Sequence, residues 1–361
     1  MKKTIALLLA LCMMFALCAC GQSASPAATP QPSPTQEAEQ PEAEPAAAPE
    51  PEEEPPAEAA ITLRLGDAAA PALGSAIAAQ NFAALVNEAS GGRIVIDYYG
   101  NAQLGDDGDL MEQVVDGTLD IGIVSCSMFS QYSDVINALQ LPFLIDDYEK
   151  EYVAITSPEA TALFDTLKPF NIKVLGAFEN GITHFANNKK AIETPEDLNG
   201  LLLRCASASV VVDAMNALNI STADIAFNEI YTALQNGVIE GEVQNIGSIF
   251  SMKHYEVANY ISLIGIYPFP VLIAMSDKSF SALSEEDQAI LIDCAAQAMK
   301  ESLESVSNYE TNVCLKTMQD EGVHVNEITD KAAFIDATKS VYDKYMENDL
   351  VAAFVEMVRG L

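Results

Sequence analysis

The chain has 361 residues and a formal net charge of −34, with 18 basic residues against 52 acidic ones. A negative field of this size opposes binding to nucleic acid and to anionic lipid surfaces, and it repels anionic ligands at long range. A pocket for an acid must therefore depend on a few local cations, which makes each candidate arginine informative.

The N-terminus predicts an export signal. Lys2 and Lys3 precede an apolar run over residues 5–17, which is shorter than the about 20 residues that a membrane span needs. Leu17 lies three positions before Cys20, and a small alanine directly precedes that cysteine, which resembles a bacterial lipobox. The pattern predicts a lipoprotein signal peptide over residues 1–20 and lipidation of Cys20. The alternative is an ordinary exported protein with a chance cysteine.

Residues 21–60 predict a disordered tether. This segment holds 10 of the 17 prolines and nine glutamates, with no lysine, arginine, leucine, isoleucine, valine or aromatic residue. Such a composition cannot bury enough apolar surface to offset its ordering entropy, and its like charges repel one another. About 300 residues remain, 61–361, with a net charge of −27 and room for one large or two medium domains.

The start of this remainder alternates strand and helix patterns. Apolar periodicity predicts strands at 61–65, 93–99 and 119–124 and helices at 72–89 and 106–115. This order is typical of a parallel sheet with helices on its faces. The acidic residues that open the helix at 106–115 lack the oxygen spacing of a calcium loop and fit an acidic first helical turn.

The second half of the chain continues the α/β pattern. We expect strands at 172–178 and 268–275, a very long helix from 284 to at least 318, and a last amphipathic helix over 331–358. The sequence shows no internal repeat and no transmembrane pattern beyond the signal peptide.

Four stretches carry a family resemblance. Residues 198–204 form a turn and an apolar strand that ends in Arg204, and residues 225–237 form a helix-like block. Residues 238–242 read Val-Ile-Glu-Gly-Glu, and residues 253–257 read Lys-His-Tyr-Glu-Val. Together they resemble the extracytoplasmic solute receptors of tripartite ATP-independent (TRAP) transporters, of the dicarboxylate-receptor type. Shorter matches to this family lie at 101–107, 116–120 and 141–144.

The resemblance implies a two-lobed α/β fold of the periplasmic-binding-protein kind, with a long helix that spans both lobes. Lobe I would take residues 61–181 and 270–309, and lobe II residues 182–269 and 310–361. A ligand would bind in the cleft between the lobes, where pockets preferentially form.

Arg204 is the first candidate site residue. It ends an apolar strand, so we expect its side chain at the carboxyl end of a sheet, where α/β proteins bind ligands. A guanidinium meets a carboxylate with two parallel hydrogen bonds. In the resembled family this arginine holds the ligand's carboxylate. The alternative is a surface arginine paired with one of the many acids.

Further ligand contacts follow only from the resemblance. Phe227 would form an aromatic wall, and an amide from Gln244 or Asn245 would orient the ligand. His184 stands where several relatives carry a second arginine; it could donate a hydrogen bond and would be charged only near or below about pH 6.5. Ser125 replaces a glutamate of the sialic-acid receptors, which argues against an amino or N-acetylated sugar acid. For each, a structural role such as a core contact or a loop amide remains the alternative.

The residue patterns give no support for catalysis or a cofactor. The three histidines are scattered, and no nucleophile elbow, phosphate loop or metal-ligand spacing is present. We expect buried free thiols beyond the signal region, with one disulfide as the open alternative because the protein is exported. These thiols belong to Cys126, Cys205, Cys294 and Cys314.

The sequence therefore predicts a lipid-anchored extracytoplasmic receptor for a small organic anion. The ligand would be a C4-dicarboxylate, a sugar acid or a related carboxylate, and the partner an ion-gradient-driven permease. Two alternatives stay open: a ligand-binding input to a membrane sensor, and a surface lipoprotein with a degenerate pocket.

Overall fold

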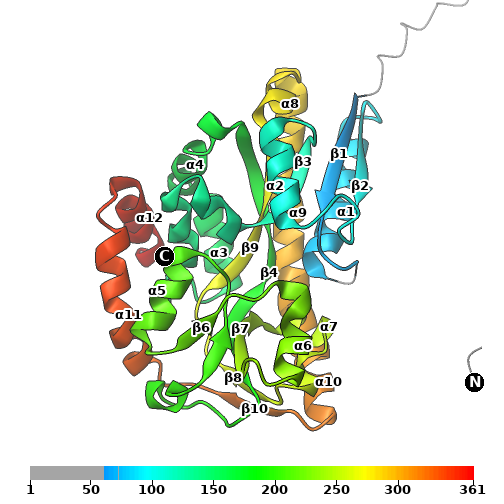
Figure 1. Ribbon diagram of the computed structural model, residues 1–361. Helices are drawn as coiled ribbons and strands as arrows, with labels where there is room; N and C mark the ends of the chain where they lie inside the picture. Colours follow the sequence, from blue (N-terminus) through cyan, green and yellow to red (C-terminus); the bar gives the residue numbers. More distant parts are fainter. Residues whose placement is uncertain (1–60, 72) are drawn as a thin grey trace, which may run out of the picture. The chain divides into compact units, whose positions relative to one another are not determined.

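A computed structural model describes residues 61–71 and 73–361, which belong to one compact unit (Figure 1). The predicted signal peptide, Cys20 and the tether lie outside these residues. Within the described part of the chain, no helix is both long enough and apolar enough to cross a membrane.

The first sheet begins as predicted, with strands and helices in alternation. β1 (Ile61–Asp67) lies between β2 (Ile94–Tyr99) and β3 (Ile121–Ser125) and pairs with both in parallel. The two connections are α1 (Gly74–Ala89) and α2 (Asp107–Asp116). The carboxyl ends of these strands therefore meet at one edge of the sheet.

One long strand joins the first sheet to the second. β4 (Ile172–Asn187) pairs antiparallel with β9 (Pro268–Ser276), and the other side of β9 pairs with β3. Residues 183–187 of β4 then pair antiparallel with β7 (Gly241–Asn245). The sequence predicted only residues 172–178 of this strand, because the polar residues that follow conceal its continuation.

The second sheet is built around the end of β4, in the strand order β6-β5-β7-β4-β8-β10. β5 pairs in parallel with both β6 and β7. The strands and helices of this half are β5 (Leu202–Arg204), α5 (Ser209–Ala217), β6 (Ser221–Ala223), α6 (Ile230–Gln235), α7 (Ile246–Ser251), β8 (Tyr260–Leu263) and β10 (His324–Glu327).

The predicted long helix is confirmed and contains one irregular turn. α9 (Glu285–Tyr309) packs against α1 and β4, as Figure 1 shows, and continues through a π-helical segment (Glu310–Cys314) into α10 (Leu315–Asp320). α10 contacts α7 and β10 of the second sheet. The helix, like β4, therefore links the elements of the two sheets.

The C-terminal prediction of one helix over 331–358 is wrong. The chain forms α11 (Ala332–Tyr345) and then α12 (Asp349–Arg359), because the Asn348 side chain accepts a hydrogen bond from Leu350 N and starts a new helix. α11 packs on α5, while α12 packs on the helices that follow the first sheet. Those helices are α3 (Tyr148–Ile155) and α4 (Pro158–Asp165).

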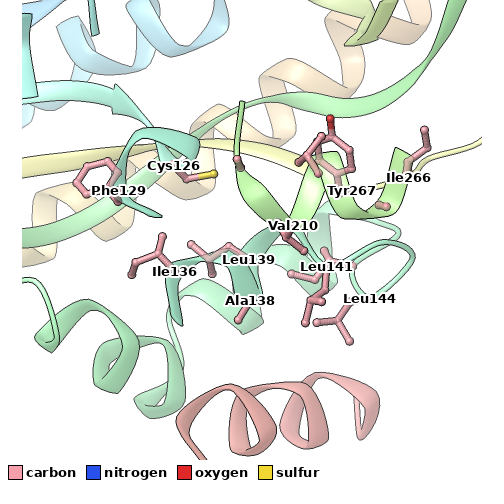
Figure 2. Close-up of a cluster of buried hydrophobic side chains, with 14 of the residues drawn as sticks. Cys126, Phe129, Ile136, Ala138, Leu139, Leu141, Leu144, Val210, Ile266 and Tyr267 are labelled. Carbon is pink, nitrogen blue, oxygen red and sulfur yellow. The ribbon is translucent and has the colours of Figure 1, made fainter. Parts of the chain in front are cut away.

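Short helical segments complete the described chain. They are η1 (Cys126–Gln131), η2 (Asp134–Gln140), η3 (Lys168–Phe170), η4 (Pro195–Leu198), η5 (Phe227–Glu229), η6 (His254–Glu256) and α8 (Asp277–Ser281). The largest hydrophobic cluster draws residues from both sheets and from α5, α11 and α12, and Figure 2 shows part of it. The four predicted thiols are free and buried.

The links between the sheets meet around three buried carboxyl groups, Glu151, Glu179 and Glu310, which we call the acid cluster. Glu310 opens the π-helical segment and accepts hydrogen bonds from the Tyr148 hydroxyl (2.6 Å) and from Gly247 N (3.1 Å). Tyr148 belongs to α3, which packs on α9, and Gly247 belongs to α7, which packs on β4 and β7, so this one carboxyl group connects the two elements.

Candidate functional site

Arg204 is half-buried at the end of β5. Its Nε donates a hydrogen bond to the carbonyl oxygen of Ile225 (3.1 Å), which fixes the direction of the side chain. Among the described residues, neither terminal guanidinium nitrogen has a hydrogen-bond partner or forms an ion pair. These nitrogens are therefore available to an anion from outside the chain.

Phe227 lies close to this arginine along the chain. It follows Ile225 by two residues, is half-buried, and its ring meets the His254 ring edge-on at 6.1 Å between centroids. His254 is fully buried, and its Nδ1 lies 2.8 Å from Glu242 Oε1. The contact with buried His254 thus fixes one edge of the Phe227 ring. The ring is only half-buried, and its predicted contact with a ligand stays a prediction.

The side-chain amides of Gln244 and Asn245 already make hydrogen bonds within the protein. Asn245 Oδ1 accepts from Ser248 N (2.8 Å) and begins α7, while Asn245 Nδ2 donates to Gln244 Oε1 (2.9 Å). Gln244 Oε1 also accepts from Asn245 N (3.0 Å). The Asn245 side chain has used its acceptor and one donor hydrogen locally, and Gln244 retains its NH₂ group as the donor for a ligand.

His184 is a neutral histidine. Its Nδ1 accepts hydrogen bonds from Ile264 N and Gly265 N, both at 3.0 Å. Burial, followed by the positive charge of Lys331, lowers the pKa of His184 from 6.5 to about 3. The expectation that His184 gains charge near pH 6.5 is therefore replaced: at neutral pH it offers only an Nε2–H donor.

Strand register places three of these residues on one face of the second sheet. Arg204 lies opposite Glu242 across β5 and β7, and Gln244 lies opposite His184 across β7 and β4. Residues two apart on a strand point to the same face of a sheet, so Glu242 and Gln244 share a face. Their cross-strand partners, Arg204 and His184, lie on that face as well.

Ser125 comes from the other sheet, at the carboxyl end of β3. Its N–H donates to Asp107 Oδ2 (3.0 Å), and burial raises the pKa of Asp107 to about 6. Asp67, at the end of β1, accepts from Ala69 N (2.8 Å) and the Tyr98 hydroxyl (3.0 Å), and burial raises its pKa to about 6 also. The sequence interpretation placed Asp107 only in an acidic helical turn and did not consider Asp67 at all.

Tyr267 is a second omission of the sequence interpretation. Its ring is fully buried, and Arg204, Cys205 and Cys126 are its electrostatic neighbours. Cys126 directly follows Ser125 at the end of β3, so Tyr267 connects the Arg204 region to the carboxyl edge of the first sheet. A lone aromatic in an apolar stretch gives no sequence signal for such a position.

Two hollows of about 470 and 330 Å³ open elsewhere on the described surface. The larger is lined by the stacked rings of Tyr260 and His324, and the smaller includes Lys344, which is already paired with Asp213 at 2.6 Å. Neither of these hollows is lined by a predicted site residue. We assign the candidate site to the Arg204 region, because an unpaired cation specifies a ligand more sharply than the volume of a hollow does.

Solved structures of bacterial receptors share this fold. The chain matches a TRAP periplasmic solute-binding protein of a Sulfitobacter species that holds β-D-galacturonate, with 29% identity and a TM-score of 0.76, over 83% of this chain and 100% of that one. It matches a second such protein, from Chromohalobacter salexigens with bound D-glucuronate, with 29% identity and a TM-score of 0.77, over 82% and 99%. The predicted two-lobed fold is thereby confirmed.

The sequence comparisons agree with the structural ones. The chain is 30% identical to a C4-dicarboxylate-binding protein of Bacillus subtilis over 71% of its own length and 73% of that protein. The family model described as bacterial extracellular solute-binding protein, family 7, matches residues 65–349. The chain therefore belongs to this family, the extracytoplasmic solute-binding proteins of TRAP transporters.

Proposed function

We propose that this protein captures a sugar acid of the hexuronate class through Arg204 and delivers it to a TRAP permease. The observation that carries the proposal is the state of the guanidinium. It is half-buried in a strongly acidic chain, yet its terminal nitrogens meet no carboxylate among the described residues. A cation that stays unpaired among so many acids is suited to an external anion.

The acids at the carboxyl edge of the first sheet favour a sugar acid over a dicarboxylate. Asp67 accepts a hydrogen bond from the Tyr98 hydroxyl and Asp107 accepts one from Ser125 N. Carboxylates of this kind accept from the hydroxyl groups of a sugar and repel a second carboxylate. Two solved relatives hold uronates, which combine one carboxylate with several hydroxyls. The relative named for C4-dicarboxylates marks the competing ligand class.

Anchoring and delivery complete the proposal. The lipobox-like residues before Cys20 and the acidic, proline-rich segment after it support a lipid anchor followed by a tether. Bacterial lipoproteins carry more than one acyl chain, and two chains are enough for stable attachment. Membership of the TRAP receptor family supports transfer of the ligand to a permease.

Isothermal titration of the purified protein with galacturonate, glucuronate and succinate tests this function. Arg204→Ala should weaken uronate binding at least tenfold, because two charged hydrogen bonds of about 1.5–3 kcal/mol each are lost. The melting temperature of the empty protein should fall only slightly, since the guanidinium makes a single internal bond, to the carbonyl oxygen of Ile225.

Arg359→Ala is the matched control. Arg359 is exposed and lies over the Tyr342 ring, 4.8 Å from its centroid, so its loss should leave uronate affinity intact. Normal binding by Arg204→Ala would refute the carboxylate assignment. Succinate binding that is tighter than uronate binding would refute the sugar-acid class.

A further inference from the structure

Tyr267 has a buried hydroxyl group without a partner. The side chain is the largest of the fully buried ones, and its hydroxyl has no partner at normal hydrogen-bond distance among the described residues. The Thr183 hydroxyl is a polar neighbour of this oxygen, but it already donates to the Tyr267 carbonyl oxygen at 2.9 Å. Buried tyrosine hydroxyls normally find a partner, so an exception needs an explanation. In Figure 2 the hydroxyl oxygen is turned away from the aliphatic side chains of Leu141 and Leu144.

The backbone holds Tyr267 firmly in this position. Its carbonyl oxygen accepts hydrogen bonds from both Thr183 N and Thr183 Oγ1, each at 2.9 Å. Thr183 lies in β4 opposite Asn245, at the point where β4 enters the second sheet. The side chain has no exposed surface in this conformation, so the hydroxyl finds no partner in solvent, and a ligand reaches it only when the surrounding elements separate.

Arg204 is the cationic neighbour of this hydroxyl. Its Nε is bonded to Ile225, and its terminal N–H groups, like the Tyr267 O–H, have no acceptor among the described residues. A guanidinium offers only donors, whereas one carboxylate offers two oxygens with about four acceptor positions. A single carboxylate placed beside Arg204 would satisfy both sets of donors.

We propose that the Tyr267 hydroxyl donates a hydrogen bond to the same ligand carboxylate that Arg204 binds. This inference rests on the proposed function and deepens it by naming a second residue that selects the acid. Arg204 supplies the charge, and Tyr267 supplies a fixed donor that favours an ionised carboxylate over a neutral sugar.

Tyr267→Phe tests the inference, because it removes one oxygen atom and keeps the ring. With galacturonate as the probe, calorimetric titration should show a dissociation constant raised about 10- to 100-fold, the range for one charged hydrogen bond. The melting temperature of the empty protein should stay the same or rise, because the lost hydroxyl had no internal partner.

Tyr342→Phe is the matched control. The Tyr342 hydroxyl donates to the Pro142 carbonyl oxygen at 2.7 Å, so its removal should lower the melting temperature and leave galacturonate affinity unchanged. Tyr267→Phe should therefore weaken galacturonate binding without lowering the melting temperature, whereas Tyr342→Phe should lower the melting temperature without weakening binding.

Three outcomes would overturn the inference. Unchanged galacturonate affinity in Tyr267→Phe, alongside normal wild-type binding and weak binding by Arg204→Ala, would sink this inference alone. A lower melting temperature for empty Tyr267→Phe would show that the hydroxyl has a partner within the fold. Absence of uronate binding by the wild type would remove the proposed function and this inference together.

Discussion

The Arg204 region and the acid cluster contain opposite kinds of unsatisfied polar group. At Arg204 and Tyr267 the unpaired atoms are donors. In the acid cluster they are acceptors, since neither oxygen of Glu151 and only one oxygen of Glu179 meets a donor N–H or hydroxyl group. Both regions are largely buried, yet they need different partners.

A proton satisfies the acid cluster from within. Burial raises the pKa of Glu151 well above its usual range and raises that of Glu179, and a protonated Glu151 donates a hydrogen bond to Glu179. Three buried carboxyl groups without a neighbouring cation cannot all ionise, so such groups retain protons. Burial likewise raises the pKa of Glu310 to about 7.

A guanidinium has no such remedy, because it cannot lose its charge in a protein. The half-buried Arg204 guanidinium therefore keeps its charge and is completed by water or by an anion from outside, whereas the acid cluster is complete without a ligand. The comparison teaches that unpaired buried carboxylate oxygens are completed by a bound proton, whereas the unpaired Tyr267 hydroxyl near a permanent cation is suited to an external anion.

The largest effect should come from removing the hub of the acid cluster. Glu310→Leu leaves the Tyr148 hydroxyl and Gly247 N without their acceptor, and each lost bond to a buried partner costs about 1–3 kcal/mol. We expect about 4 kcal/mol less stability by urea denaturation. Glu301→Leu, at an exposed position on α9, is the control and should change stability by less than about 0.5 kcal/mol. A small effect of Glu310→Leu would mean that this hub is not essential.

The second prediction concerns the pH dependence of stability. The pKa of Glu310 is about 7 in the folded protein against 4.5 ordinarily, so the folded state keeps a proton that the unfolded chain releases. Stability should therefore fall as the pH rises from about 4.5 to 7, by about 3 kcal/mol from this group.

Glu310→Gln isolates this contribution, because glutamine keeps an acceptor but does not titrate. Denaturation midpoints measured between pH 5 and 8 should fall less steeply in Glu310→Gln than in the wild type. Glu301→Gln should retain the wild-type slope. Equal slopes in all three proteins would show that Glu310 ionises normally and would remove the distinction between the two regions.

The fold was predictable from sequence wherever local patterns agree with the tertiary structure. Strand alternation and turn residues located β1, β2 and β3, and an apolar strand that ends in a charge located Arg204. Long-range pairing was not visible in the sequence. Residues 179–187 of β4 look polar and irregular, and they form a strand because β7, β8 and β9 pair with them.

The site was only half predictable for the same reason. Arg204 carries a charge that stands out in an acidic chain, whereas Tyr267 looks like any core aromatic. Its unpaired hydroxyl exists only after β4 and β9 have brought distant residues together. The neutral state of His184 also depends on backbone donors 80 and 81 residues away in sequence.

The smallest expected effect is on ligand affinity between pH 7 and 9, and it tests whether the two regions act independently. In this range Arg204 stays charged, His184 stays neutral because its pKa is about 3, and Asp67 and Asp107 are ionised because their pKa values are about 6. The acid cluster continues to titrate in this range through Glu310, whose pKa is about 7. Galacturonate affinity measured by calorimetry should therefore change less than about twofold across the range. The contrary outcome is a galacturonate affinity that falls with rising pH in the wild type but not in Glu310→Gln. That result would show that protonation of Glu310 and ligand binding are coupled, because binding buries the acid cluster further.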